Sequence, residues 1–198
     1  MLSSNTSFIS HLDACENKLE IDREKKMNGS RVVLLALLLI ASTPQGFASS
    51  PTAEEALALP ALIGMQLSIR KAASQGKVPN SVVNCVNQLP SDSFLPVFHA
   101  LMEDNLSSEE ISLTEQFFQS AIGRKYSKHG LAQLYTAVGE SPPEPAPTFS
   151  DSEYAELERF SQTSAGEKLM VRKVMESESA RRAVSARIQE LLALCRQK

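Results

Sequence analysis

A nine-residue motif occurs twice in this chain, and it constrains the fold more than any other feature of the sequence. FFQSAIGRK at 117–125 matches FSQTSAGEK at 160–168, at an offset of 43 residues. The motif positions that match are the following pairs: Phe117 and Phe160, Gln119 and Gln162, Ser120 and Thr163, Gly123 and Gly166, Lys125 and Lys168. Upstream, the matching pairs are Ser107 with Ser150 and Glu110 with Glu153. The repeat predicts two related units, at about 106–139 and 149–176, each made of a helix, a break and a second helix.

The residues of the motif explain the break. A Ser or Thr before a helix accepts hydrogen bonds from the unpaired amides of its first turn, so we expect Ser120 to cap one helix and Thr163 or Ser164 the other. The Phe is expected to bury its ring at the end of the preceding helix. The Gly, which lacks a Cβ, permits close approach of two helices. Binding of an anion at the helix N-terminus beside Lys125 or Lys168 is the alternative for this motif.

The segment between the two units is rich in proline. Residues 140–148 read ESPPEPAPT, with four prolines in nine residues. Such a segment is typical of an extended, semi-rigid linker. A proline-rich recognition ligand is the alternative.

The rest of the chain also reads as helices. A helix is predicted over 54–76, with Pro60 starting or kinking it and Gly76 ending it; its apolar residues occupy more than one side. Such a helix is either central in the fold or an interface for self-association. Further helices are predicted at 81–89, 94–105 and 178–196, and no stretch alternates strictly enough for a strand. The predicted fold class is all-α, a compact bundle of about 7–8 helices containing the two units and their linker.

The N-terminal quarter resembles a targeting segment. Arg31 precedes the apolar run VVLLALLLIA at 32–41, and Gly46 and Ala48 form a small-x-small site. This pattern predicts a secretory signal peptide at 27–48, cleaved after Ala48, and an exported protein that does not span the membrane when mature. A buried strand or helix is the alternative for the run. Residues 1–26, a mixture of acids and bases, are interpreted as an over-extended start or a disordered leader. The single helical domain then covers 49–198.

The net charge of −3 is unevenly divided along the predicted mature chain. Residues 49–158 carry six bases and fourteen acids, and residues 159–198 carry nine bases and four acids. The two parts complement each other within one fold, or the basic part forms a face for an anionic partner or membrane surface. The residues of that candidate face are Arg172, Lys173, Arg181, Arg182 and Arg187. The overall acidity argues against a nucleic-acid partner.

Two of the three cysteines, Cys85 and Cys195, lie in the predicted mature chain. An even count in an exported protein indicates a disulfide, which would join the last helix to the second one. Two separate buried thiols are the alternative. No C-x-x-C motif is present, which argues against thiol redox catalysis.

The first copy of the motif and the segment before it resemble a known family. FFQSAIGRK, preceded by PVFHALMEDNLSSEEI, resembles the bacterial domain of unknown function 2059 family over about residues 94–139, with 150–175 as a diverged second copy. Many members of that family have Pro after the Ser, where this chain has Ala121. The resemblance implies a periplasmic helical protein of a Gram-negative bacterium, and it supplies no catalytic or binding residues.

Residues with catalytic potential are few. His99 and Glu103 are four apart on one predicted helix, so both could reach one metal ion, but no third ligand is suggested by spacing, and a surface ion pair is the simpler interpretation. No nucleophile elbow, P-loop or dinucleotide fingerprint occurs, and no cofactor is predicted. The sequence therefore favours a non-catalytic module for protein interaction or binding. The alternatives are a carrier of a lipid or other apolar small molecule and, third, an enzyme.

Overall fold

A computed structural model describes residues 51–197, and within them the chain is entirely helical, with eight α-helices and no strand. The predicted all-α class is confirmed. The signal peptide at 27–48 and the segment 1–26 lie outside the described residues. In chain order the elements are α2 (Ala53–Ser74), α3 (Asn80–Asn87), α4 (Leu95–Asn105), α5 (Ser108–Gln119), α6 (Ala121–Val138), α7 (Asp151–Ser161), α8 (Ser164–Gly166), the π-helix η2 (Glu167–Val171), the 3₁₀ helix η3 (Val174–Glu176) and α9 (Glu178–Arg196).

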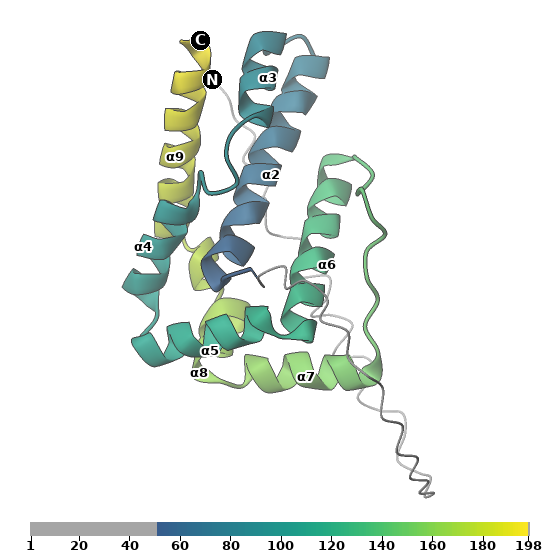
Figure 1. Cartoon of the computed structure of the whole chain (residues 1–198), viewed down its shortest axis with the longest axis vertical. Coiled ribbons are helices and arrows are strands. Elements are labelled where there is room, and N and C mark those ends of the chain that lie inside the picture. Colours follow the sequence, from purple (N-terminus) through teal and green to yellow (C-terminus); the bar gives the residue numbers. More distant parts are fainter. Residues whose placement is uncertain (1–50, 198) are drawn as a thin grey trace, which may run out of the picture.

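Helix α2 lies in the middle of the molecule and packs against α3, α4, α5 and α6 (Figure 1). It begins at a capping box: Thr52 accepts from the amide of Glu55, whose carboxylate accepts from the amide of Thr52. Pro60 therefore lies inside the helix and does not start it. Its neighbours bury Leu62, Met65 and Leu67, whereas Leu59 and Ile63 are only partly buried. Helix α2 is therefore central in the fold, and self-association through it stays a prediction.

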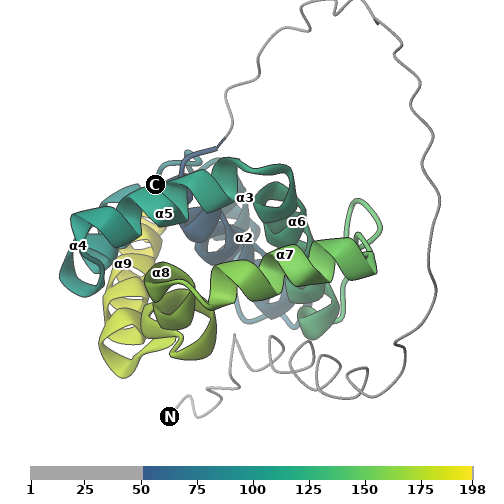
Figure 2. The ribbon, with the colours of Figure 1, turned by 90° about the horizontal axis from the view of Figure 1, so that it is seen from below.

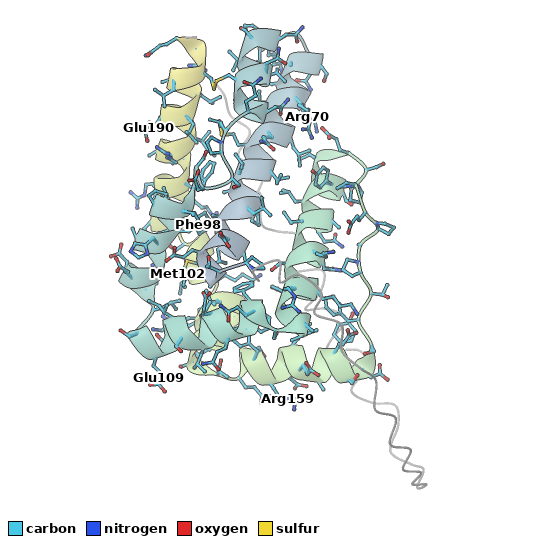
Figure 3. The ribbon with its side chains drawn as sticks, in the orientation of Figure 1. Arg70, Phe98, Met102, Glu109, Arg159 and Glu190 are labelled. Atoms are coloured by element: carbon cyan, nitrogen blue, oxygen red, sulfur yellow. A yellow bond between two sulfur atoms is a disulfide. The ribbon has the colours of Figure 1, made fainter. Side chains whose placement is uncertain are left out.

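The last helix, α9, packs with the first three helices of the described chain. Helices α3, α4 and α9 share one core with α2, and the side chain of Phe98 on α4 points into it, whereas Arg70 and Glu190 lie on the outer surface (Figure 3). The Sγ atoms of Cys85 and Cys195 are 2.01 Å apart, which matches the predicted pairing. This disulfide joins α3 to the last turn of α9.

Helices α5, α7 and α8 of the two repeat units form the opposite end of the molecule, and α6 rises from there beside α2. Helices α5 and α7 run in opposite directions across this end, and a second apolar core lies around them (Figures 1 and 2). The linker 140–148 descends beside α6 from its C-terminal end to the start of α7. It is held there by Arg70 with Glu140 at 3.1 Å and by His129 Nδ1 with the Pro147 carbonyl at 3.0 Å. Within 51–197, no helix combines the length and the apolar composition needed to cross a bilayer.

Candidate functional site

The repeated phenylalanines meet each other. Phe117 ends α5, Phe160 ends α7, and their rings stack with centroids 3.8 Å apart and planes 7° from parallel. The ring of Phe118 meets Phe117 edge-on at 5.2 Å, and Tyr126 does the same at 5.9 Å. Contacts between aromatic rings add to the free energy gained from burying them. The repeated Phe of each unit thus contributes to one aromatic cluster between the two units.

The break in each unit is closed by the same pair of hydrogen bonds. Ser120 donates to the carbonyl of Phe117 at 2.6 Å and accepts from the amide of Gly123 at 3.0 Å. Thr163 donates to the carbonyl of Phe160 at 2.7 Å and accepts from the amide of Gly166 at 3.0 Å. Each hydroxyl therefore ends one helix and caps the next, so Thr163, and not Ser164, is the cap of the second unit.

The two glycines lie against the backbone of the helix before them. A Cβ on Gly123 would be 1.9 Å from the carbonyl oxygen of Phe117, and one on Gly166 would be 1.9 Å from that of Phe160. Real side chains do not approach a backbone oxygen so closely, so only glycine fits at either position without a shift of backbone. In each unit, the glycine at the start of the second helix thus lies against the end of the first helix, and this contact sets the angle between the two helices.

The lysines of the motif bind the capping-box glutamates of the opposite unit. Lys125 donates to both carboxylate oxygens of Glu153, at 2.6 and 2.7 Å, and Lys168 donates to Oε2 of Glu110 at 2.6 Å. Each glutamate also accepts from the amide of its own cap, Ser150 or Ser107, at 2.8 and 2.7 Å. The lysines, then the cap amides, lower the pKa of both carboxyls, that of Glu153 to about 2.

These contacts are reciprocal, as in a two-fold dimer, although both halves belong to one chain. Glu110 and Glu153 occupy equivalent positions, and so do Lys125 and Lys168, so each unit gives a lysine and receives one. The units differ in their contacts with the rest of the molecule: the first packs on α2, and the second contacts α4 and α9 through η3. Phe118, which is buried in the second apolar core around α5 and α7, corresponds at the offset of 43 residues to the polar Ser161.

The second unit is cut short compared with the first. Helix α6 has 18 residues, whereas α8 has three and continues as the five-residue π-helix η2. Lys173, just after η2, has a φ of 50°, in the left-handed region that residues other than glycine seldom adopt. Val171, the last residue of η2, is 57% exposed, and with Leu194 it is one of two large apolar side chains exposed in the described part of the chain.

The residues of the candidate basic face have different surroundings. Arg172 and Arg181 are exposed, and Arg182 pairs with Glu178 at 3.3 Å on the surface of α9. Arg187 is half-buried: its Nε donates to the carbonyl of Ser93 at 2.9 Å, and its Nη1 lies 2.7 Å from Glu190. Arg187 therefore holds α9 to the turn before α4.

His99 has a carboxylate on each side. Its Nδ1 lies 2.6 Å from Glu54 on α2, and its Nε2 lies 3.4 Å from Glu103 one turn along α4. The hydrogen bond with Glu54, followed by the charge of Glu103, raises the pKa of His99. Sequence spacing indicated Glu103 but could not indicate Glu54, which is 45 residues away. Among the described residues no group of three or more His, Cys, Asp or Glu is arranged to hold a metal ion.

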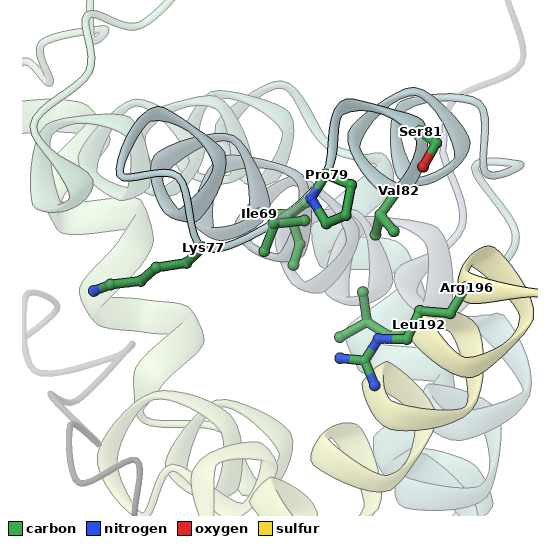
Figure 4. A pocket seen from close by; sticks show the side chains of 8 residues that line it. Ile69, Lys77, Pro79, Ser81, Val82, Leu192 and Arg196 are labelled. Carbon is green, nitrogen blue, oxygen red and sulfur yellow. The ribbon is translucent and has the colours of Figure 1, made fainter.

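A pocket of about 260 Å³ lies where the C-terminal end of α2, the start of α3 and the end of α9 meet, and it is open to solvent (Figure 4). Its lining is largely apolar, with Ile69, Val82 and Leu192 facing one another and Arg196 at the rim. It is smaller than pockets that enclose drug-sized ligands, which usually have at least about 300 Å³.

Comparison of the chain with models of protein families, with curated proteins and with solved structures finds no match. The resemblance described above rests on the residues of about 94–139 and on nothing further.

Proposed function

We propose that this chain is an exported, periplasmic protein that binds another protein and catalyses no reaction. Export is supported by the apolar run at 32–41 and by the Cys85–Cys195 disulfide, a bond that persists in oxidising compartments. The repeated motif has a structural role: the hydroxyls of Ser120 and Thr163 and the amines of Lys125 and Lys168 bind other parts of the same chain. These groups build a scaffold.

The observation that carries the binding role is the surface at Val171. This exposed apolar side chain ends a π-helix, in which the amide of Arg172 donates to the carbonyl of Glu167 at 2.8 Å, and the strained Lys173 follows it. Both π-helical turns and left-handed residues with a Cβ cost free energy, and both are frequent at functional sites. An exposed apolar residue between such irregularities fits a contact with a partner.

The charge around Val171 indicates the chemistry of that partner. The exposed Arg172 follows it directly, and the exposed Arg181 and Arg182 come next along the sequence, in the first turns of α9. An exposed cation next to an apolar side chain favours a partner surface that has an apolar depression with acidic residues around it. The partner is therefore proposed to be an acidic protein of the same compartment.

Site-specific photocrosslinking in the cell tests this proposal. A photoreactive phenylalanine analogue replaces Val171 in one variant and Leu194, the other exposed large apolar residue, in a matched control. We expect one discrete crosslinked protein with the Val171 variant and none with the Leu194 variant, and we expect Arg172→Glu to abolish it. Equal, diffuse crosslinking at both positions would contradict a specific contact at Val171.

A carrier of a small apolar molecule is the second candidate, and the pocket beside the disulfide is the observation that favours it. The apolar lining with Arg196 at its rim suits a short apolar tail with an acidic head group. Native mass spectrometry of the protein from the bacterial envelope tests this. A bound small acid that is lost in an Arg196→Ala variant would support the carrier, and a bound protein that is lost in Arg172→Glu would support the interaction module.

A further inference from the structure

The interface between the two units is built from equivalent residues on both sides. Phe117 stacks on Phe160, and each unit offers one lysine and one glutamate to the other. Interfaces of this kind usually join two copies of a protein. Here the linker 140–148 joins the two halves, and every other copy of the chain carries the same two halves.

We propose that the first unit also fits the second unit of another copy, so that two chains exchange residues 151–197 and form a closed dimer. The exchange keeps the stack of Phe117 on Phe160 and both Lys–Glu pairs, and each of these contacts is then formed between two chains. It also keeps the packing of α9 on α3, because α9 moves with the second unit. The Cys85–Cys195 bond then joins two chains and makes the dimer covalent.

The contacts that belong to the closed single chain alone are those of the linker. None of residues 140–148 is buried. Two exposed ion pairs hold the linker, Arg70 with Glu140 and Lys128 with Glu144, together with the contact between His129 and the Pro147 carbonyl. Exposed ion pairs contribute little to stability. Exchange therefore removes few contacts, while the units and their cores are preserved, which is the condition for a low cost of domain swapping.

The length of the linker gives a second argument. From Lys125, which binds the start of α7 through Glu153, helix α6 rises about 20 Å to Val138. The linker must cover that distance back for the chain to close on itself. Shortening the linker below this reach prevents closure within one chain and leaves exchange as the way to form the interface.

The first test uses the unaltered chain and two isotopes. Reduced, unfolded chains with and without ¹⁵N label are mixed equally and refolded with oxidised glutathione over a range of protein concentrations. The thiols of Cys85 and Cys195 lose two protons and two electrons, and the glutathione disulfide is reduced to two glutathione molecules. The dimer is isolated by size exclusion and digested without reduction, and the disulfide-linked peptides are weighed.

Exchange predicts a dimer fraction that rises with concentration, in which mixed-label Cys85–Cys195 peptide pairs are as frequent as same-label pairs. The proposal is overturned if no dimer forms at any concentration, if the dimer contains same-label pairs alone, or if its mixed pairs join other cysteines. A substitution at Val171 is expected to leave the result unchanged, since that residue lies outside the unit interface.

The second test removes the linker. Without residues 140–148, three residues separate α6 from α7, and they span at most about 14 Å. We expect this chain to be a folded dimer at all concentrations, covalently linked through Cys85 and Cys195. The matched control replaces 140–148 with nine Gly and Ser residues, which restore the reach, and is expected to give monomers as its main species. A folded monomer or an unfolded chain from the deletion would contradict exchange.

Discussion

The fold leaves no room for a side chain at Gly123. Its replacement by Ala would put a methyl group 1.9 Å from the carbonyl oxygen of Phe117. The two helices of the unit would have to separate, and we expect Gly123→Ala to lower the free energy of unfolding by about 3 kcal/mol or more. Urea denaturation followed by circular dichroism measures this. Gly166→Ala is expected to act similarly, because its Cβ would meet the carbonyl of Phe160 at the same distance.

Gly130, on the same helix as Gly123, provides the control for this prediction. A Cβ there meets nothing within 4 Å. In an open helical position, Ala is favoured over Gly by about 0.5–1 kcal/mol, so Gly130→Ala is expected to stabilise the protein by that amount. If the two substitutions in α6 had equal effects, close packing of Gly123 on α5 would be refuted.

The lowered pKa of Glu153 predicts how the free energy of unfolding depends on pH. Its pKa is lowered from 4.5 to about 2 in the folded chain, by Lys125 first and then by the amide of Ser150. A carboxyl with a depressed folded pKa stabilises the protein fully above its unfolded pKa, and the contribution is lost as the pH falls through the folded value. The stability difference between wild type and Glu153→Gln is therefore expected to be constant near neutral pH and to shrink between pH 4.5 and 2.

Urea unfolding of both proteins at a series of pH values measures this difference. In a Lys125→Met background the main cause of the low pKa is absent, and the difference is expected to depend less on pH. A difference between wild type and Glu153→Gln that did not change between pH 4.5 and 2 would show that Lys125 does not hold this carboxylate ionised in solution.

At the scale of elements, the ion pairs between the units predict a rescue by charge reversal. Lys125→Glu puts two carboxylates together, and Glu153→Lys puts two amines together, so each variant is expected to destabilise the packing of α7 on α6. The double variant restores an opposite pair at the same position, and its stability is expected to exceed that of either single variant. Both side chains are about one-third exposed, which limits the size of the effect.

A double-mutant cycle in urea gives the coupling between Lys125 and Glu153. Lys128 and Glu144 form the comparison pair, because their side chains are 67% and 75% exposed and 3.4 Å apart. We expect measurable coupling for the first pair and little for the second. Independent effects at Lys125 and Glu153 would mean that the two units are not joined there.

The repeat in the sequence predicted two related units and their caps, because capping depends on residues three positions apart. It could not predict that the units face each other, since that is a contact across 43 residues and depends on how α5 and α7 cross. For the same reason the sequence left an anion as the alternative partner of the motif lysines, whereas their partners in the structure are Glu153 and Glu110. The sequence did contain a signal for these partners, because Ser107 and Glu110 are repeated together with the motif. Each Ser and Glu pair is, however, explained by a capping box within its own helix, so it did not indicate a contact with the other unit.

At the scale of the whole molecule, the first and last helices of the described chain, α2 and α9, contribute to one core, and the two units lie between them in the sequence. Pairing of the cysteines could be predicted from their number and from the predicted export. The position of the basic C-terminal part could not, because charge alone does not say which arginines face inward. Arg187 is used within the fold to hold the Ser93 carbonyl, whereas Arg181 is exposed. Arg187 thus fits the interpretation that the basic part is used within the fold, and a basic face for an anionic partner stays a prediction.

The disulfide gives the prediction for the molecule as a whole. It closes a loop of 110 residues and joins the last turn of α9 to α3, so in the reduced chain α9 is held by its apolar contacts and by Arg187. Constraint of the unfolded chain by a loop of this length gives at most about 4–5 kcal/mol. We expect reduction to lower the free energy of unfolding by up to that amount, with the fold retained. Urea unfolding with and without reductant measures it, and the Cys85→Ala/Cys195→Ala variant is expected to be as unstable as the reduced protein and insensitive to reductant. An equal stability of the oxidised and reduced chains would mean that the bond does not stabilise the fold, and α9 would then depend on its apolar contacts and on Arg187.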